Sequence, residues 1–356
     1  MFVLDSHCDT PSQILRLRDL ALDNDHAHVD FPKLKKGAVD GAFFALYIPA
    51  SMDADADAAM AYARKLMDGV EDTVRANSDK AAICLSAAEA LENKKKGLFS
   101  VFIGLENASP AGVSIEKIKE LYDWGVRYIT LCHSGNNEVC DSCAPKQKRW
   151  GGLSPFGREV VAEMNRLGML IDVSHLSDDS FYDVLKNSSK PVVATHSCCR
   201  ALADHPRNMT DDMIKALAQA GGVIQINFYP LFLDGGFEKQ LSDSGLMEKG
   251  GEIEAAFKAD PSDQAKREAW NRIQDELMEL PRPSYELIVD HIDHVVKLVG
   301  IDHVGLGSDF DGIDVTPKGM EDASCFQRVF EEMRRRGYSE GDIEKVAGGN
   351  FLRLML

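Results

Sequence analysis

The sequence lacks the features of a membrane protein, of a nucleic-acid-binding protein and of a disulfide-rich domain. Its longest apolar stretches, such as residues 41–50, fall far short of the ~20 residues that a membrane-spanning helix needs. It contains no basic stripe of the kind that binds phosphates, and its formal net charge is −17. We therefore expect neither a membrane nor nucleic acid as a partner.

Paired cysteines are also scarce. Of the eight cysteines, Cys140 and Cys143 form a lone C-x-x-C motif, with no second pair at the spacing of a zinc ribbon. The apolar residues 2–4 pass directly into polar ones without a secretory signal, so we expect reduced thiols and a cytoplasmic protein. We expect Cys140 and Cys143 to be ordinary loop thiols, with a structural metal or a redox pair as the alternatives.

Short apolar runs alternate with helical patterns along the chain. The runs are continuous and rich in β-branched or aromatic residues, which is typical of parallel strands covered on both faces. Eight runs stand out, with a ninth near 83–85: residues 2–4, 42–48, 99–105, 128–131, 170–173, 192–194, 223–227 and 304–307. Ser154, Ser177 and Thr210 are expected to cap helices between them. The pattern predicts one α/β domain over residues 1–356, a (β/α)₈ barrel of the TIM type.

Residues 233–283 interrupt this alternation. The stretch is charged and helix-prone and has no strand-like run. It lies between the seventh and eighth predicted strands, so we expect a helical insertion before the last strand. Beside the mouth of a barrel such an insertion is either a lid or a surface excursion with no role in chemistry.

Side chains of the metal-ligating type gather where the predicted strands end. In a (β/α)₈ barrel the C-terminal strand ends form the active site, so these side chains are expected at one rim. They are His7, Asp9, Glu106, His133, His175, His196 and Asp309. Four of the ten histidines are among them. Imidazole nitrogens and carboxylate oxygens are the ligands that Zn²⁺ and similar divalent ions prefer, so the sequence predicts a metal site.

The spacing of His7 and Asp9 favours one shared ion, because residues i and i+2 of an extended segment point to the same face. A carboxylate such as Glu106 is able to bridge two ions, and two ions ~3.5–4 Å apart share and activate one water. The number of candidate ligands favours two metals, with one metal in a polar pocket as the alternative. The remaining histidines are expected outside the site: His26 and His28 in a solvent-facing loop, His291 and His294 at the surface or in a second layer.

The motifs around these residues resemble the renal, or membrane, dipeptidase family of zinc peptidases. They run in order through nearly the whole chain: residues 5–11 (DSHCDTP), 104–107 (GLEN), 127–133 (RYITLCH), 152–157 (GLSPFG), 171–175 (IDVSH), 195–197 (THS), 207–208 (RN), 226–229 (INFY), 305–312 (GLGSDFDG) and 349–351 (GNF). Each motif is weak alone, and together they are specific. Two positions depart from the family pattern: Asn107 stands where many relatives have glycine, and Cys8 where some have asparagine.

The resemblance implies a distorted barrel with two divalent ions, expected to be Zn²⁺, with Mn²⁺ and Co²⁺ as ions that also suit such ligands. His7, Asp9 and Glu106 would hold one ion. Glu106, His175 and His196 would hold the other. The implied activity is hydrolysis of free dipeptides, including those with a C-terminal D-residue, by a water or hydroxide that bridges the ions.

The resemblance also assigns roles to four further residues. Asp309 would orient the water or shuttle its proton, and His133 would face the substrate carbonyl oxygen. Arg207 would hold the free carboxylate of the dipeptide, a task that suits a guanidinium group, unless it simply pairs with Asp204. Tyr229 would contact substrate. Because no secretory signal or anchor tail is seen, the chain resembles a soluble prokaryotic-type member, and the family suggests a homodimer.

Two other function classes remain as alternatives. Another binuclear metal amidohydrolase, such as a deaminase or lactonase, usually has a His-x-His motif after the first strand and often a carboxylated lysine as the bridge. Here the motif is His7-x-Asp9 and the bridge candidate is Glu106. A non-catalytic metal-binding or sensor protein would be expected to lack a ligand, and no ligand position is missing.

Overall fold

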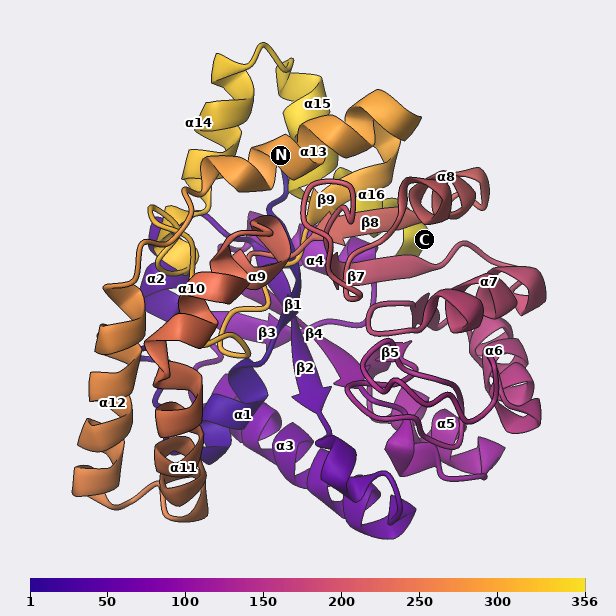
Figure 1. The fold of residues 1–356 in the computed structure, drawn as a ribbon, viewed down its shortest axis with the longest axis horizontal. Coiled ribbons are helices and arrows are strands. Elements are labelled where there is room, and N and C mark those ends of the chain that lie inside the picture. Colours follow the sequence, from indigo (N-terminus) through magenta and orange to yellow (C-terminus); the bar gives the residue numbers. More distant parts are fainter. Residues whose placement is uncertain (356) are drawn as a thin grey trace.

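The computed structural model describes residues 1–355 and shows a barrel of parallel strands surrounded by helices (Figure 1). The strands are β1 (Leu4–Cys8), β2 (Gly41–Tyr47), β3 (Ala81–Ile83), β4 (Phe99–Glu106), β5 (Val126–Thr130), β6 (Leu170–Asp172), β7 (Val193–Ser197), β8 (Val223–Ile226) and β9 (Val304–Leu306). The helices are α1 (Thr10–Leu15), α2 (Phe31–Lys36), α3 (Ala56–Ala76), α4 (Ala87–Lys95), α5 (Ile115–Asp123), α6 (Pro155–Leu167), α7 (Asp178–Asn187), α8 (Asp211–Gln219), α9 (Pro230–Leu233), α10 (Phe237–Ser244), α11 (Leu246–Ala259), α12 (Gln264–Met278), α13 (Glu286–Val299), α14 (Gln327–Arg335), α15 (Glu340–Glu344) and α16 (Asn350–Leu352).

The strand order confirms the predicted (β/α)₈ barrel. Eight strands pair in parallel in the order β1-β2-β4-β5-β6-β7-β8-β9, while β3 pairs only with β4 and lies off this path. The barrel is closed by the segment that follows β9. There the Asp309 N–H donates to the carbonyl oxygen of His7 at 3.0 Å, and the Asp9 N–H donates to that of Phe310 at 2.8 Å. The ninth predicted run is therefore β3, an added strand outside the ring.

The first strand differs from its predicted position at residues 2–4. It runs from Leu4 to Cys8, so His7 lies within the strand rather than after it. The prediction was wrong because polar residues face the barrel interior here. The Asp5 carboxylate accepts hydrogen bonds from the N–H of Ser308 at 2.8 Å and from its hydroxyl at 2.5 Å, and Ser6 donates to a backbone carbonyl at 2.7 Å. Paired in this way, the two residues are buried without an apolar pattern.

The predicted helix caps are confirmed. The hydroxyls of Ser154, Ser177 and Thr210 accept backbone N–H groups at the starts of α6, α7 and α8. Each bond satisfies one of the free donors of a helix N-terminus. Among residues 1–355, no helix has the length and apolar character that crossing a bilayer requires.

The insertion before the last strand is helical, as expected. It consists of α10, α11 and α12, and Figure 1 shows α11 and α12 beside α1. These helices share a small apolar core of their own, which includes Phe237, Phe257 and Trp270. A charged contact joins the insertion to the barrel, because Arg16 at the end of α1 lies 3.6 Å from Glu254 of α11. The insertion therefore stands at the rim where β1 ends.

One glycine inside the barrel makes room for an aromatic ring. Tyr128 of β5 is fully buried, and its hydroxyl lies 2.7 Å from Nδ1 of His7. A Cβ atom at Gly104 of β4 would lie 2.3 Å from Cζ of that ring. Only glycine therefore allows Tyr128 to reach across the barrel to His7.

His291 of α13 lies in the second layer. Its Nδ1 accepts the N–H of Cys199 at 3.0 Å, and its Nε2 lies 3.1 Å from the carbonyl oxygen of Leu233. Because Nδ1 accepts, Nε2 carries the proton and donates, which requires a neutral ring. Burial lowers the pKa of His291 from 6.5 to about 4. This imidazole ties α13 to the segments after β7 and β8.

We expect Gly104→Ala to lower the free energy of unfolding by about 1–3 kcal/mol, because the added methyl group overlaps the Tyr128 ring. Urea denaturation would measure the loss. Gly251→Ala is the matched control, since a Cβ there meets nothing within 4 Å on exposed helix α11 and should leave stability equal or higher. Equal stability of both variants would contradict this view of the barrel interior.

We expect His291 to make the protein less stable in acid. Its folded pKa of about 4 lies below the unfolded value of 6.5, so the unfolded chain binds more protons between these values. The contribution is complete above pH 6.5 and is lost as the pH falls toward 4, by up to about 3 kcal/mol. Unfolding free energies measured across this range should depend less on pH in His291→Asn than in the wild type. Equal slopes in the two proteins would contradict this account of His291.

Candidate metal centre and substrate pocket

The predicted ligands converge at the C-terminal ends of the strands. Glu106, the last residue of β4, lies at the centre, and histidines from β1, from β7 and from the turn after β6 surround it. Its Oε1 atom is 3.0 Å from Nε2 of His175 and 3.4 Å from Nε2 of His196. Its Oε2 atom is 3.7 Å from Nε2 of His7, which in turn lies 3.5 Å from Oδ2 of Asp9. The two carboxylate oxygens of Glu106 thus face two different sets of side chains.

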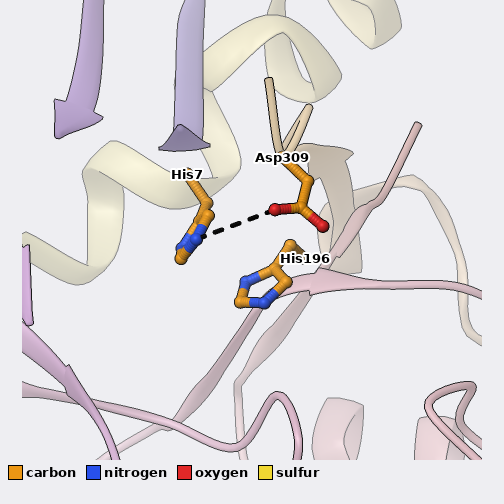
Figure 2. Close-up of side chains that lie close together, drawn as sticks. All are labelled: His7, His196 and Asp309. Carbon is orange, nitrogen blue, oxygen red and sulfur yellow. Dashed lines mark ion pairs between the residues drawn. The ribbon is translucent and has the colours of Figure 1, made fainter. Parts of the chain in front are cut away.

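Two more predicted residues lie at the edge of this cluster. Nε2 of His133 is 3.8 Å from Oε1 of Glu106. Oδ1 of Asp309 is 4.0 Å from Nε2 of His7, and Figure 2 shows these two side chains facing each other beside His196. Asn227 donates to the other oxygen of Asp309 at 2.8 Å, which turns Oδ1 toward the cluster.

The cluster has the donor set of a divalent metal site. Nε2 of His7 is buried and has no hydrogen-bond partner. Nε2 of His175 and Nε2 of His196 lie 2.9 Å apart. Within residues 1–355, three groups of close ligand atoms fit an ion: His7 with His196 and Asp309; Glu106 with His133 and His175; and His7 with Asp9 and Glu106. Nitrogen and carboxylate ligands around one unpartnered imidazole fit Zn²⁺ or a similar ion.

The pKa shifts of these side chains also favour a bound cation. Burial raises the pKa of Asp9, and the nearby negative charge of Glu106 raises it further. A cation between the two carboxylates would remove this repulsion. Burial and the positive charge of Arg207 lower the pKa of His175, while burial and His7 lower that of His196. Both imidazoles are therefore favoured in the neutral form, which is the form that binds metals.

Residues behind the cluster fix the orientation of two imidazoles. The sequence predicted no role for these residues. The Thr195 hydroxyl donates to Asp172 at 2.6 Å, so it accepts from Nδ1 of His196 at 2.8 Å. This leaves Nε2 of His196 free to bind a metal ion. Tyr128 contacts Nδ1 of His7 in a similar position. The available signal was polarity within the apolar run 170–173, where Asp172 interrupts a buried strand.

The backbone is strained close to the site. Within residues 1–355, four of the six non-glycine residues with positive φ lie here: Asn107 at +81°, His175 at +68°, Asp309 at +62° and Asp311 at +66°. Such conformations cost energy and persist where surrounding contacts hold them. Asn107 takes this conformation directly after Glu106, which explains why asparagine is tolerated where many relatives have glycine. Its amide donates to the Ile48 carbonyl oxygen at 3.0 Å and so holds the turn.

A cavity of about 290 Å³ opens over the cluster. Tyr229 and Phe232, which follow β8, line it together with His133 and Asp309. The insertion contributes part of the wall, through Glu254, Lys258, Trp270 and Gln274. Tyr229 was predicted near the substrate, but no residue of the insertion was predicted to line the cavity. A charged helical stretch does not indicate which of its faces contacts the barrel.

Arg207 is buried behind the pocket wall. It donates to the carbonyl oxygen of His196 at 2.9 Å, and its guanidinium lies 5.2 Å from the ring centre of Phe232. Its Nε atom is buried without a partner. No carboxylate within residues 1–355 forms an ion pair with it, so the alternative of a pair with Asp204 is wrong.

The predictions for His28 and for the two loop cysteines, all outside the cluster, have different outcomes. His28 is not solvent-facing: it is half-buried, accepts the N–H of Asp311 at 2.9 Å and lines the cavity. The polar sequence around it concealed this contact with the loop after β9. Cys140 and Cys143 are free thiols, as expected, and no candidate metal group within residues 1–355 includes a cysteine.

Known proteins are similar in sequence to this chain along most of its length. Residues 1–356 match the membrane dipeptidase family, also called peptidase family M19. The dipeptidase verJ of Clonostachys rogersoniana is 32% identical over 337 residues, which are 92% of this chain and 75% of that protein. The dipeptidase aclJ of Aspergillus oryzae is 32% identical over 337 residues, which are 93% of this chain and 70% of that protein.

Solved structures share the fold. The probable dipeptidase PvdM from Pseudomonas aeruginosa superposes with a TM-score of 0.82 at 29% identity, over 100% of this chain and 94% of that one. A metallopeptidase from Rhodobacter sphaeroides, solved with a phosphinate mimic of the dipeptide L-Ala-D-Ala, gives a TM-score of 0.79 at 26% identity, over 100% of this chain and 98% of that one. The chain belongs to the membrane dipeptidase family, peptidase family M19, and is a peptidase of that family.

Proposed function

We propose that the protein is a binuclear metal-dependent dipeptidase, with two Zn²⁺ ions, that hydrolyses free dipeptides. The observation that carries this proposal is the position of Glu106, whose two oxygens face His7 on one side and His175 with His196 on the other. One ion would be held by His7, Asp9 and Glu106, and the other by Glu106, His175 and His196. A bridge by glutamate, rather than by a carboxylated lysine, favours a dipeptidase over a deaminase or lactonase.

The ions, when bound, would supply an activated water and polarise the scissile carbonyl group. Asp309 is placed to accept a proton at Oδ1 and return it to the leaving amine, since Asn227 holds its other oxygen. His133 would stabilise the developing charge on the carbonyl oxygen from the open side of the cluster. Each task falls to a side chain with a defined orientation at the rim.

Substrate binding would use the residues around the cavity. Arg207 would hold the C-terminal carboxylate of the dipeptide, because it is a buried cation without a carboxylate partner, and Tyr229 would contact the bound peptide. A C-terminal D-residue is supported by the related metallopeptidase solved with a mimic of L-Ala-D-Ala. Residues 233–283 are proposed as a lid because four of their side chains line the cavity. The homodimer and the cytoplasmic location stay predictions.

The proposal predicts about two divalent ions per chain and chelator-sensitive cleavage of dipeptides but not of tripeptides. Metal analysis of the purified protein and amine release from a panel of L-L and L-D dipeptides would test it. Two ions without dipeptide cleavage would shift the reaction to another amidohydrolase. Absence of metal after add-back, in protein never exposed to chelator, would refute the metal centre.

We expect Asp309→Asn to lower kcat by about 10²–10⁴-fold, because an amide neither accepts nor returns the proton. The metal content should stay at the wild-type level, since Asp309 is not among the ligands proposed here. Steady-state kinetics together with metal analysis of the same sample would separate the two effects. Loss of an ion in this variant would show that Asp309 is a ligand instead.

A further inference from the structure

The cavity extends away from the metal cluster into a second compartment. A neighbouring cavity of about 320 Å³ shares Arg16, Trp270 and Gln274 with the first one. It lies between the end of α1 and the insertion helices α11 and α12, which stand side by side in Figure 1. The two adjoining cavities together offer more room than two small residues require, and the second one is lined largely by polar and charged side chains.

Three of the cations that line the two cavities are matched by carboxylates, and a fourth, Arg267, donates to the carbonyl oxygen of Pro261 at 2.7 Å. Lys258 lies 2.6 Å from Glu254, and Arg16 lies 3.6 Å from the same carboxylate. Arg18 lies 2.6 Å from Asp311. A negatively charged substrate group would have to compete with these internal carboxylates for each of the three cations.

One half-buried carboxylate of the first cavity has no hydrogen-bond or ion-pair partner among residues 1–355. Asp314, in the loop after β9, lines the cavity and is half-buried. Among residues 1–355, no group donates a hydrogen bond to its side chain or forms an ion pair with it. Burial and the nearby charge of Glu254 raise its pKa to about 6, and the charges of Lys258 and Arg16, which are paired with Glu254, only partly offset this rise.

The position of Asp314 suits a side chain of the substrate rather than its α-amino group. The α-amino nitrogen of a dipeptide lies only about 2.5 Å from the scissile carbonyl carbon, so it stays beside the metal cluster. Asp314 belongs to none of the groups of close ligand atoms there. It also lies after β9, whereas Arg207, the proposed anchor of the C-terminal carboxylate, follows β7. The residue facing Asp314 is then the N-terminal one.

We propose that Asp314 makes the enzyme select dipeptides whose N-terminal residue has a cationic side chain, arginine or lysine. The guanidinium or ammonium group would pass along the cavity and pair with the free carboxylate. This inference rests on the proposed dipeptidase function and adds the substrate class. An ion pair in a half-buried pocket is stronger than one at the open surface, so its loss should be measurable.

The test compares kcat/KM for L-Arg-L-Ala, L-Ala-L-Ala and L-Glu-L-Ala. The wild type should prefer the arginyl peptide, and this preference needs no variant. Asp314→Asn should lower kcat/KM for L-Arg-L-Ala about tenfold more than for L-Ala-L-Ala. Asp314→Lys should move the preference toward L-Glu-L-Ala. Glu248→Gln is the control, because it removes one exposed negative charge from α11 outside the cavity.

Equal losses for all three peptides in Asp314→Asn, or a wild type without preference for the arginyl peptide, would overturn the inference. Calorimetry with uncleavable methyleneamine analogues of L-Arg-L-Ala and L-Ala-L-Ala measures binding without cleavage. It therefore tests the cation subsite independently of the proposed function. Tighter binding of the arginyl analogue, lost in Asp314→Asn, supports the cation subsite even if no dipeptide is cleaved. Equal binding of both analogues refutes the subsite whether or not cleavage occurs.

Discussion

The structure depends on one buried carboxylate, that of Glu106. Imidazoles from two strands and from the turn after β6 approach its two oxygens, and a fourth, His133, lies 3.8 Å away. Burial alone would raise the pKa of Glu106, but the neighbouring imidazoles, His7 first among them, hold it well below its usual range. A charge removed from water in this way must be compensated by its neighbours. The requirement explains why so many polar groups lie at one end of an otherwise apolar barrel.

The same requirement extends outward from the site. Three of the side chains around Glu106 have orienting partners: Tyr128 for His7, Thr195 for His196 and Asn227 for Asp309. These partners determine which atom each ligand presents, and they lie in strands or directly after them. Rigid strands position groups more accurately than mobile loops do. The insertion carries different residues, which shape the cavity rather than the chemistry.

Much of this arrangement follows from the sequence, and the remainder depends on the folded chain. The barrel and the position of the ligands were predictable because apolar runs end in His, Asp or Glu and parallel strands present their ends at one rim. The start of β1 was not, since Asp5 and Ser6 are buried only because partners distant in sequence satisfy them. The contributions of His28 and of the insertion were missed for a similar reason. Local polarity predicts exposure, and only tertiary contacts reverse that expectation.

Closure of the barrel has a consequence for when the enzyme becomes active. Asp5 and Ser308, whose hydrogen bond joins β1 to the segment after β9, are 303 residues apart. His7 and Asp309 belong to the same two segments, so the site does not exist until the last strand pairs with the first. Contacts of such long sequence separation form late in folding. A chain that is still being synthesised therefore holds an incomplete site, and hydrolysis begins only after the whole barrel has assembled.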